Sequence, residues 1–162
     1  RYGLVGSEMC IRDRDNLLTQ NNYEYTDPKI IEIADKILKT DPKNEDAYFY
    51  KLSAQYVAGD MEGVLKTTDL MVKNSPDDPV GYEMRSFIKA EEGDLAGAIE
   101  DLEKVIELDS ESEYIAYYEM ELADLKFQKA EIESDAAEKE RLESEAGAIE
   151  AKAHQDLSLI HI

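Results

Sequence analysis

The stretch Pro79–Ser112, which reads PVGYEMRSFIKAEEGDLAGAIEDLEKVIELDSES, decides the fold. Its centre is the dipeptide Gly93–Asp94. Glycine readily adopts the left-handed conformation that ends a helix, and aspartate can cap the helix that follows. After this dipeptide, apolar side chains recur at helical spacing and share one face: Ala98, Leu102, Val105 and Ile106. The stretch therefore predicts two helices joined by a tight turn.

The same pattern occurs one step earlier in the chain. Gly59–Asp60 precedes Gly93–Asp94 by 34 residues, and Tyr48 precedes Tyr82 by the same 34. Three dipeptides follow this step as well: Asp41–Pro42, Ser75–Pro76 and Asp109–Ser110. A fixed period of this length is typical of helical repeats, in which each unit buries its apolar face against its neighbours.

A 34-residue period with Gly-Asp in the middle and Asp-Pro at the end resembles the tetratricopeptide repeat (TPR). The resemblance implies an all-α fold, an α-α superhelix of antiparallel helical hairpins. In that family small residues occupy the positions of Ala98 and Val105, and a large apolar residue occupies that of Leu102. The match is closest over residues 45–112, although Val64 and Thr68 depart from the usual residue types. It is weaker over 27–44 and weakest over 113–156.

The period divides the chain into four units. Residues 15–44 are expected to form a partial repeat, 45–78 and 79–112 two whole repeats, and 113–156 a divergent hairpin that caps the array. Asp27–Pro28 is a typical helix start. Because the first repeat is cut short, we expect its isoleucines to lie partly uncovered: Ile30, Ile31, Ile33 and Ile37.

The last hairpin is predicted to be elongated. It lacks Gly-Asp near Phe127–Gln128, so its first helix should continue to about Glu133, with one stripe of Ala116, Met120, Ala123, Phe127 and Ala130. Asp135 and Glu138 have the spacing of a capping box for the next helix. The stripe of that helix consists of Leu142, Ala146, Ile149 and Ala153, and runs to about His154.

Both ends of the chain differ from the rest. Residues 1–14 resemble a translated transposase-type sequencing adapter, and Leu157–Ile162 fits the translation of its reverse complement. We therefore expect the natural part to be about Asp15–Asp156. The only cysteine, Cys10, lies in the first of these foreign segments, so we expect no disulfide and no cysteine metal site. The compartment is left open, because the natural N-terminus is expected to be missing.

Composition and charge limit the classes of partner that the chain is expected to bind. The chain is 43% hydrophobic, enough to bury a core, and 18 Lys and Arg stand against 38 Asp and Glu, a formal net charge of -20. Such a charge repels nucleic acid phosphates. No apolar run approaches the roughly 20 residues of a membrane span. We therefore expect neither nucleic acid binding nor membrane insertion.

The TPR resemblance also implies where a partner would bind. In the family, the first helix of each repeat lines a concave groove. Carried over by position, the groove comprises Phe49, Tyr50, Ser53, Tyr56, Glu83, Met84, Phe87, Glu91, Tyr117, Tyr118, Glu121 and Asp124. Aromatic side chains bury large areas and carboxylates favour Lys or Arg, so we expect a protein or peptide partner that is basic or aromatic and apolar.

One known TPR specificity, recognition of a peptide C-terminus, does not fit this sequence. Its clamp for a peptide C-terminus uses Lys, Arg and Asn, whereas the corresponding positions here carry Phe49, Glu83 and Tyr117. We therefore do not expect recognition of chaperone tails.

No motif predicts catalysis, a cofactor or a metal. His154 is expected to be a solvated residue. The carboxylate run Glu131, Glu133, Asp135, Glu138 and Glu140 lacks the glycine and spacing of a calcium loop, and a solvated helix face explains it better. The leading hypothesis is a binding scaffold without enzyme activity. The alternatives are a spacer or homo-oligomerising segment, with self-association through Glu113–His154, and part of an enzyme whose catalytic domain lies upstream.

Overall fold

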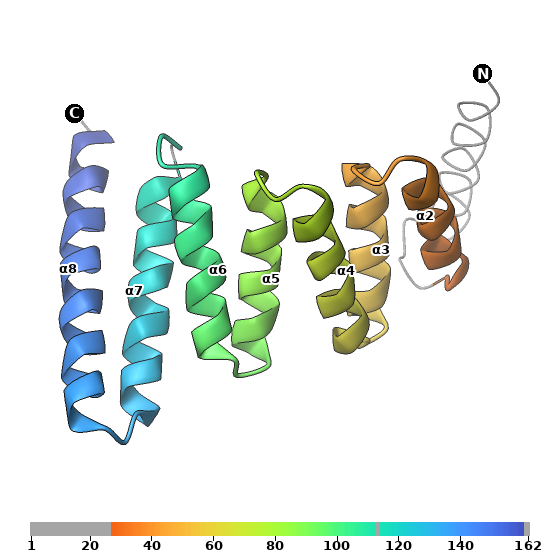
Figure 1. Ribbon diagram of the computed structural model, residues 1–162. Coiled ribbons are helices and arrows are strands. Elements are labelled where there is room, and N and C mark those ends of the chain that lie inside the picture. The colour runs from red at the N-terminus through yellow and green to blue at the C-terminus, as the bar shows by residue number, and fades with distance from the viewer. Residues whose placement is uncertain (1–26, 113, 161–162) are drawn as a thin grey trace. The chain divides into compact units, whose positions relative to one another are not determined.

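A computed structural model describes residues 27–112 and 114–160, with side chains as far as Leu157. Every regular element in this part of the chain is an α-helix (Figure 1). The chain divides into two compact units, Arg1–Pro76 and Asp77–Ile162. Residues 1–14, which we expect to be foreign, and the stub expected over 15–25 lie outside the described residues.

The described part of unit 1, residues 27–76, contains helices α2 (Lys29–Thr40), α3 (Glu45–Val57) and α4 (Met61–Asn74). The carboxylate of Asp27 accepts a hydrogen bond from the Lys29 amide at 2.9 Å, so α2 begins at the predicted Asp-Pro signal. The expectation that the α2 isoleucines lie partly uncovered is wrong for Ile30, Ile33 and Ile37, which are buried, whereas Ile31 is half-buried. Ile30 and Ile37 are fully buried, because α2 packs its apolar stripe against α3, where Ala54 meets Ile30.

Unit 2 contains four helices: α5 (Pro79–Glu91), α6 (Leu95–Leu108), α7 (Ile115–Ile132) and α8 (Ala136–Ile160). Its core joins Ala98, Ile99, Leu102 and Val105 of α6 to Tyr118, Leu122 and Leu125 of α7. The stripe predicted on α6 is thus the centre of this core, with Ile106 packed at its edge.

The two Gly-Asp turns have the same geometry in both units. Gly59 and Gly93 have φ values of 72° and 84°, the left-handed region that favours glycine. The next aspartate caps the following helix: Asp60 accepts from the Gly63 amide at 2.9 Å, and Asp94 from the Gly97 amide at 3.0 Å. The turns predicted from the repeat are confirmed.

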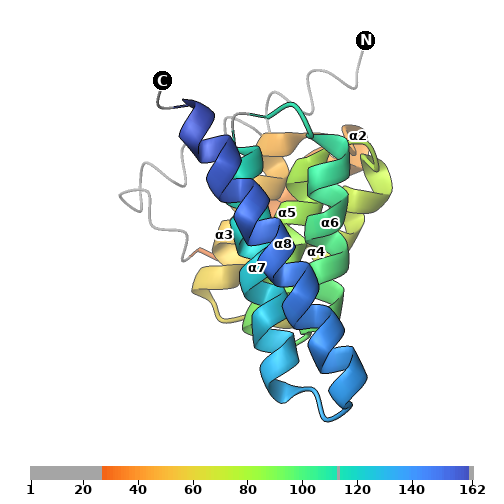
Figure 2. The ribbon, with the colours of Figure 1, turned by 90° about the vertical axis from the view of Figure 1, so that its left-hand side faces the viewer.

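The hairpin of α7 and α8 is longer than the others, as its sequence predicts. Helix α7 has 18 residues against 13 in α5, and α8 has 25 (Figure 2 shows the two side by side). Helix α8 continues beyond the expected end near His154 to Ile160. Ala116, Ala123 and Ala130 are buried as predicted, whereas Met120 of the same stripe is 36% exposed. On α8, Leu142, Ala146 and Ala153 are buried.

Only half of the predicted capping box forms. The Asp135 carboxylate accepts from the Glu138 amide at 2.9 Å, as expected. The Asp135 amide, however, donates to Glu133 at 3.0 Å, and the Glu138 side chain binds Arg141 at 2.6 and 2.8 Å. The guanidinium one turn later offers a charge-assisted pair that a neutral amide cannot match.

Buried ion pairs join the helices of unit 2. The Asp101 carboxylate on α6 pairs with two cations of α5, the Arg85 guanidinium at 2.6 Å and the Lys89 ammonium at 2.8 Å. The Lys126 ammonium on α7 lies 2.9 Å from Glu103 of α6 and 2.8 Å from Glu145 of α8. Lys126 is therefore a shared contact of three helices.

Within the described residues, no helix is long and apolar enough to cross a membrane.

Candidate interaction surface

The residues expected to contact a partner lie on α3, α5 and α7, the first helices of their hairpins. Each unit has its own first-helix face, by which we mean the outward side of its first helices. The face of unit 1 comprises Phe49, Ser53 and Tyr56, and the face of unit 2 comprises Glu83, Phe87, Tyr117, Glu121 and Asp124. Spacings of three, four and seven residues keep each set on one side of its helix.

In unit 1 the face is aromatic. Phe49 and Tyr56 are 49% and 51% exposed, and Ser53 between them is half-buried. Tyr50 was also expected on this surface, but it is half-buried and packs against the Ile30–Ala54 cluster. It meets the Phe49 ring edge-on, with ring centroids 5.5 Å apart, and so holds Phe49 in place.

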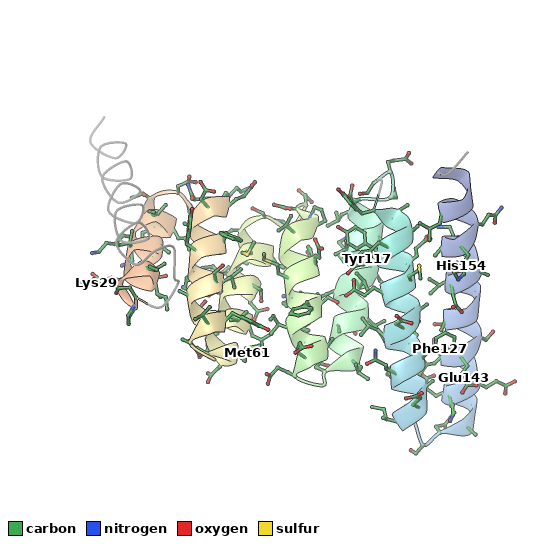
Figure 3. The ribbon with its side chains drawn as sticks, turned by 180° about the vertical axis from the view of Figure 1, so that it is seen from behind. Lys29, Met61, Tyr117, Phe127, Glu143 and His154 are labelled. Carbon is green, nitrogen blue, oxygen red and sulfur yellow. The ribbon has the colours of Figure 1, made fainter. Side chains whose placement is uncertain are left out.

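In unit 2 each first helix contributes one well-exposed aromatic ring. Phe87 of α5 is 49% exposed. Tyr117 lies in the first turn of α7 (Figure 3), and its exposed fraction is 61%. Met84 is half-buried and Glu91 is exposed on α5. Tyr118, expected on the surface, is only 8% exposed and belongs to the core of unit 2.

The Tyr118 hydroxyl connects α7 to α5. It donates a long hydrogen bond to Glu83 Oε2 at 3.4 Å. Burial raises the pKa of Tyr118 to about 12, and the negative charges of Glu83, Asp109 and Glu121 add to the effect. Glu83, Tyr118 and Glu121 are therefore close enough to act on one another, although they come from two helices.

Negative charge gathers beside this tyrosine without a cation. Glu121 is half-buried, and its pKa is raised by burial and then by the charges of Glu83 and Asp124. None of the ion pairs among the described residues involves any of these three carboxylates. Elsewhere in unit 2, the buried carboxylate of Asp101 has two cations next to it.

The face extends further than the sequence indicated. Val80 is 43% exposed and lies two turns before Phe87 on α5, and Tyr114 is 58% exposed just before α7. Continuing the helical spacing one or two turns toward each N-terminus would have found both residues. They add apolar area next to the carboxylates.

The other sequence candidates lie away from this face. His154 is exposed on α8 and lies 3.9 Å from Glu150 one turn earlier. In the carboxylate run, Glu138 pairs with Arg141. No group of His, Cys, Asp or Glu in the described residues is arranged to hold a metal ion.

No protein-family model matches the sequence, and no curated protein matches it. Solved structures do resemble it. MamA from Desulfovibrio magneticus RS-1, residues 41 to the end, is 18% identical with a TM-score of 0.64, and the alignment covers 94% of this chain and 76% of that one. The ArsTM double mutant of MamA RS-1 is also 18% identical, with a TM-score of 0.57 and coverages of 90% and 76%.

At this identity the likeness shows the fold alone. MamA is a TPR-like helical protein, so the fold of this chain is all-α and TPR-like, as the 34-residue period predicts.

Proposed function

We propose that this chain is a protein-interaction scaffold that binds a peptide or partner segment on the first-helix faces of its units. The observation that carries the proposal is the exposure of four aromatic rings on first helices: Phe49, Tyr56, Phe87 and Tyr117. A TPR-like fold supports it, because such folds present first helices to partners. No catalytic role is proposed for any residue.

The chemistry of the face favours a basic or aromatic-apolar partner. Exposed rings gain free energy when a partner covers them, and nearby carboxylates attract Lys or Arg. The net charge of -20 adds a long-range attraction for basic segments.

A peptide array tests the proposal with two variants. Phe87→Ala with Tyr117→Ala removes one well-exposed ring from each first helix of unit 2. Ile132→Ala is the matched control, since Ile132 is 74% exposed at the end of α7, about two turns beyond Asp124, the last residue of the face. We expect the double variant to lose binding and the control to retain it.

Absence of binding by the unmodified chain would contradict the proposal, as would equal binding by all three proteins. Sedimentation of the full chain shows whether a second copy occupies the face, because the double variant would then lower the measured mass. That outcome would favour self-association over capture of a separate partner.

A further inference from the structure

The first-helix face of unit 2 combines apolar area with uncompensated charge. Phe87 on α5 and Tyr117 on α7 expose about half of their side chains or more. Glu83 lies one turn from Phe87, and Glu121 lies one turn from Tyr117. Tyr118 links these two helices through its bond to Glu83. The face thus presents rings and carboxylates from both helices together.

These carboxylates contribute little to the fold that holds them. Burial raises the pKa of Glu121, and the charges of Glu83 and Asp124 raise it further, because ionised carboxylates at these positions repel one another. Among the described residues, their side chains take part in one hydrogen bond, the long one from Tyr118, a neutral donor. By contrast, Asp101 and Lys126 have ion-pair partners within 2.9 Å. A cation supplied from outside would relieve this repulsion.

Resting on the proposed function, we propose that this part of the face is an anchor for an arginine or lysine side chain of a partner peptide. The cationic group binds between Glu83 and Glu121, and the apolar part of the side chain packs against Phe87 and Tyr117. Arginine suits both surfaces, because its guanidinium pairs with carboxylates and stacks on aromatic rings.

A peptide side chain fits better than a bare metal ion. Among the described residues no cluster is arranged to hold a metal. Divalent cations also gain nothing from neighbouring rings, whereas a long cationic side chain buries its stem against them. A peptide side chain can therefore cover the exposed rings of Phe87 and Tyr117, whereas a metal ion cannot.

Acidic conditions should release the anchor. The groups that act on Glu121 are Glu83 from α5 and Asp124 from α7, with Tyr118 and, through it, Asp109 close by. Because the pKa of Glu121 is raised, this carboxyl takes up its proton at a higher pH than an ordinary glutamate. Affinity for the cationic side chain should fall as the pH falls through that range.

The test compares a short peptide with one central arginine to the same peptide with citrulline, which keeps the shape and removes the charge. The full chain should bind the arginine peptide about tenfold more tightly by calorimetry, a difference of about 1.4 kcal/mol. Added salt should reduce this difference.

The variant Glu83→Gln with Glu121→Gln should remove most of the arginine preference. Its melting temperature should stay the same or rise, because a like-charge cluster is neutralised. Glu100→Gln is the matched control: Glu100 is exposed on α6, and its replacement removes a charge outside the face. The control should keep the arginine preference.

Equal affinity for the two peptides would overturn the anchor while leaving the scaffold proposal standing, since peptide still binds. A double variant that melts at a lower temperature than the control would also overturn the anchor proposal, because Glu83 and Glu121 would then stabilise the folded state. Failure of the chain to bind any peptide on the array would remove both proposals.

Discussion

Asp101 is a buried, charged residue of unit 2. Its side chain is 5% exposed, and those of its partners Arg85 and Lys89 are 17% and 21% exposed. Burial alone would raise the pKa of Asp101, but hydrogen bonds from Arg85 and Lys89 outweigh it and hold the pKa below its usual value. The ionised form is therefore the one that stabilises unit 2.

We expect Asp101→Asn to destabilise the chain by about 2 kcal/mol, because Arg85 and Lys89 lose a charged acceptor. Urea unfolding measures this loss, with Asp77→Asn at an exposed position as the control. The contribution of Asp101 is present above its unfolded pKa and disappears as the pH falls through its lowered folded pKa. Equal stability of both variants would show that the α5–α6 pairs are not stabilising.

Glu121 should show the opposite dependence on pH. Its folded pKa is raised, so between the unfolded and folded values the native state binds the proton more tightly and stability falls as the pH rises. We expect Glu121→Gln to be more stable than the unmodified chain at neutral pH. The advantage should shrink as the pH is lowered below the raised pKa, which thermal melts across pH can follow. A constant difference would contradict the assigned cause.

At the scale of the helix, the sequence predicts the structural features that depend only on residues close together in the chain. The Gly-Asp turns, the α6 stripe and the unbroken α7 all follow from residues near one another in the chain. The inward position of Tyr118 beside the outward Tyr117 does not, because adjacent tyrosines are equivalent until the register of α7 against α6 is known. Burial of Ile30 likewise depends on α3, a separate element.

One substitution should have opposite effects at two glycines. Gly93 has a φ of 84°, and Gly93→Ala should cost about 1 kcal/mol because side chains disfavour that conformation. Gly147 lies within α8, and a Cβ added there meets nothing within 4 Å. Gly147→Ala should therefore stabilise by about 0.5–1 kcal/mol. Chemical denaturation of both variants measures the pair, and a shared sign would refute the turn interpretation.

At the scale of the whole molecule, acidity is the dominant property. The net charge of -20 repels itself in the folded state, where the carboxylates are closer together than in the unfolded chain. We expect added sodium chloride to raise the melting temperature, since salt screens repulsion between exposed charges. Calorimetry over a salt series checks this, and a melting temperature that falls steadily would mean that attractive ion pairs dominate.

The sequence predicts the scaffold more fully than the face. Repeat spacing and stripes are enough to predict an all-α TPR-like fold. The gathering of Glu83, Glu121 and Tyr118 depends on how α5 and α7 approach each other, which no single helix encodes. Their grouping on one face was expected from the resemblance, whereas the lack of ion-pair partners for the carboxylates required the structure.

The position of Lys126 has a consequence for how unit 2 comes apart. The Lys126 ammonium pairs with both Glu103 and Glu145, and its side chain is only 9% exposed. When α8 detaches, Lys126 loses Glu145, so the ammonium at the α6–α7 contact keeps only the carboxylate of Glu103. Opening of α8 is thus energetically linked to opening of the contact between α6 and α7. Fraying that stops at a repeat boundary, common in modular arrays, becomes unfavourable here, and the C-terminal half should open as a single cooperative block.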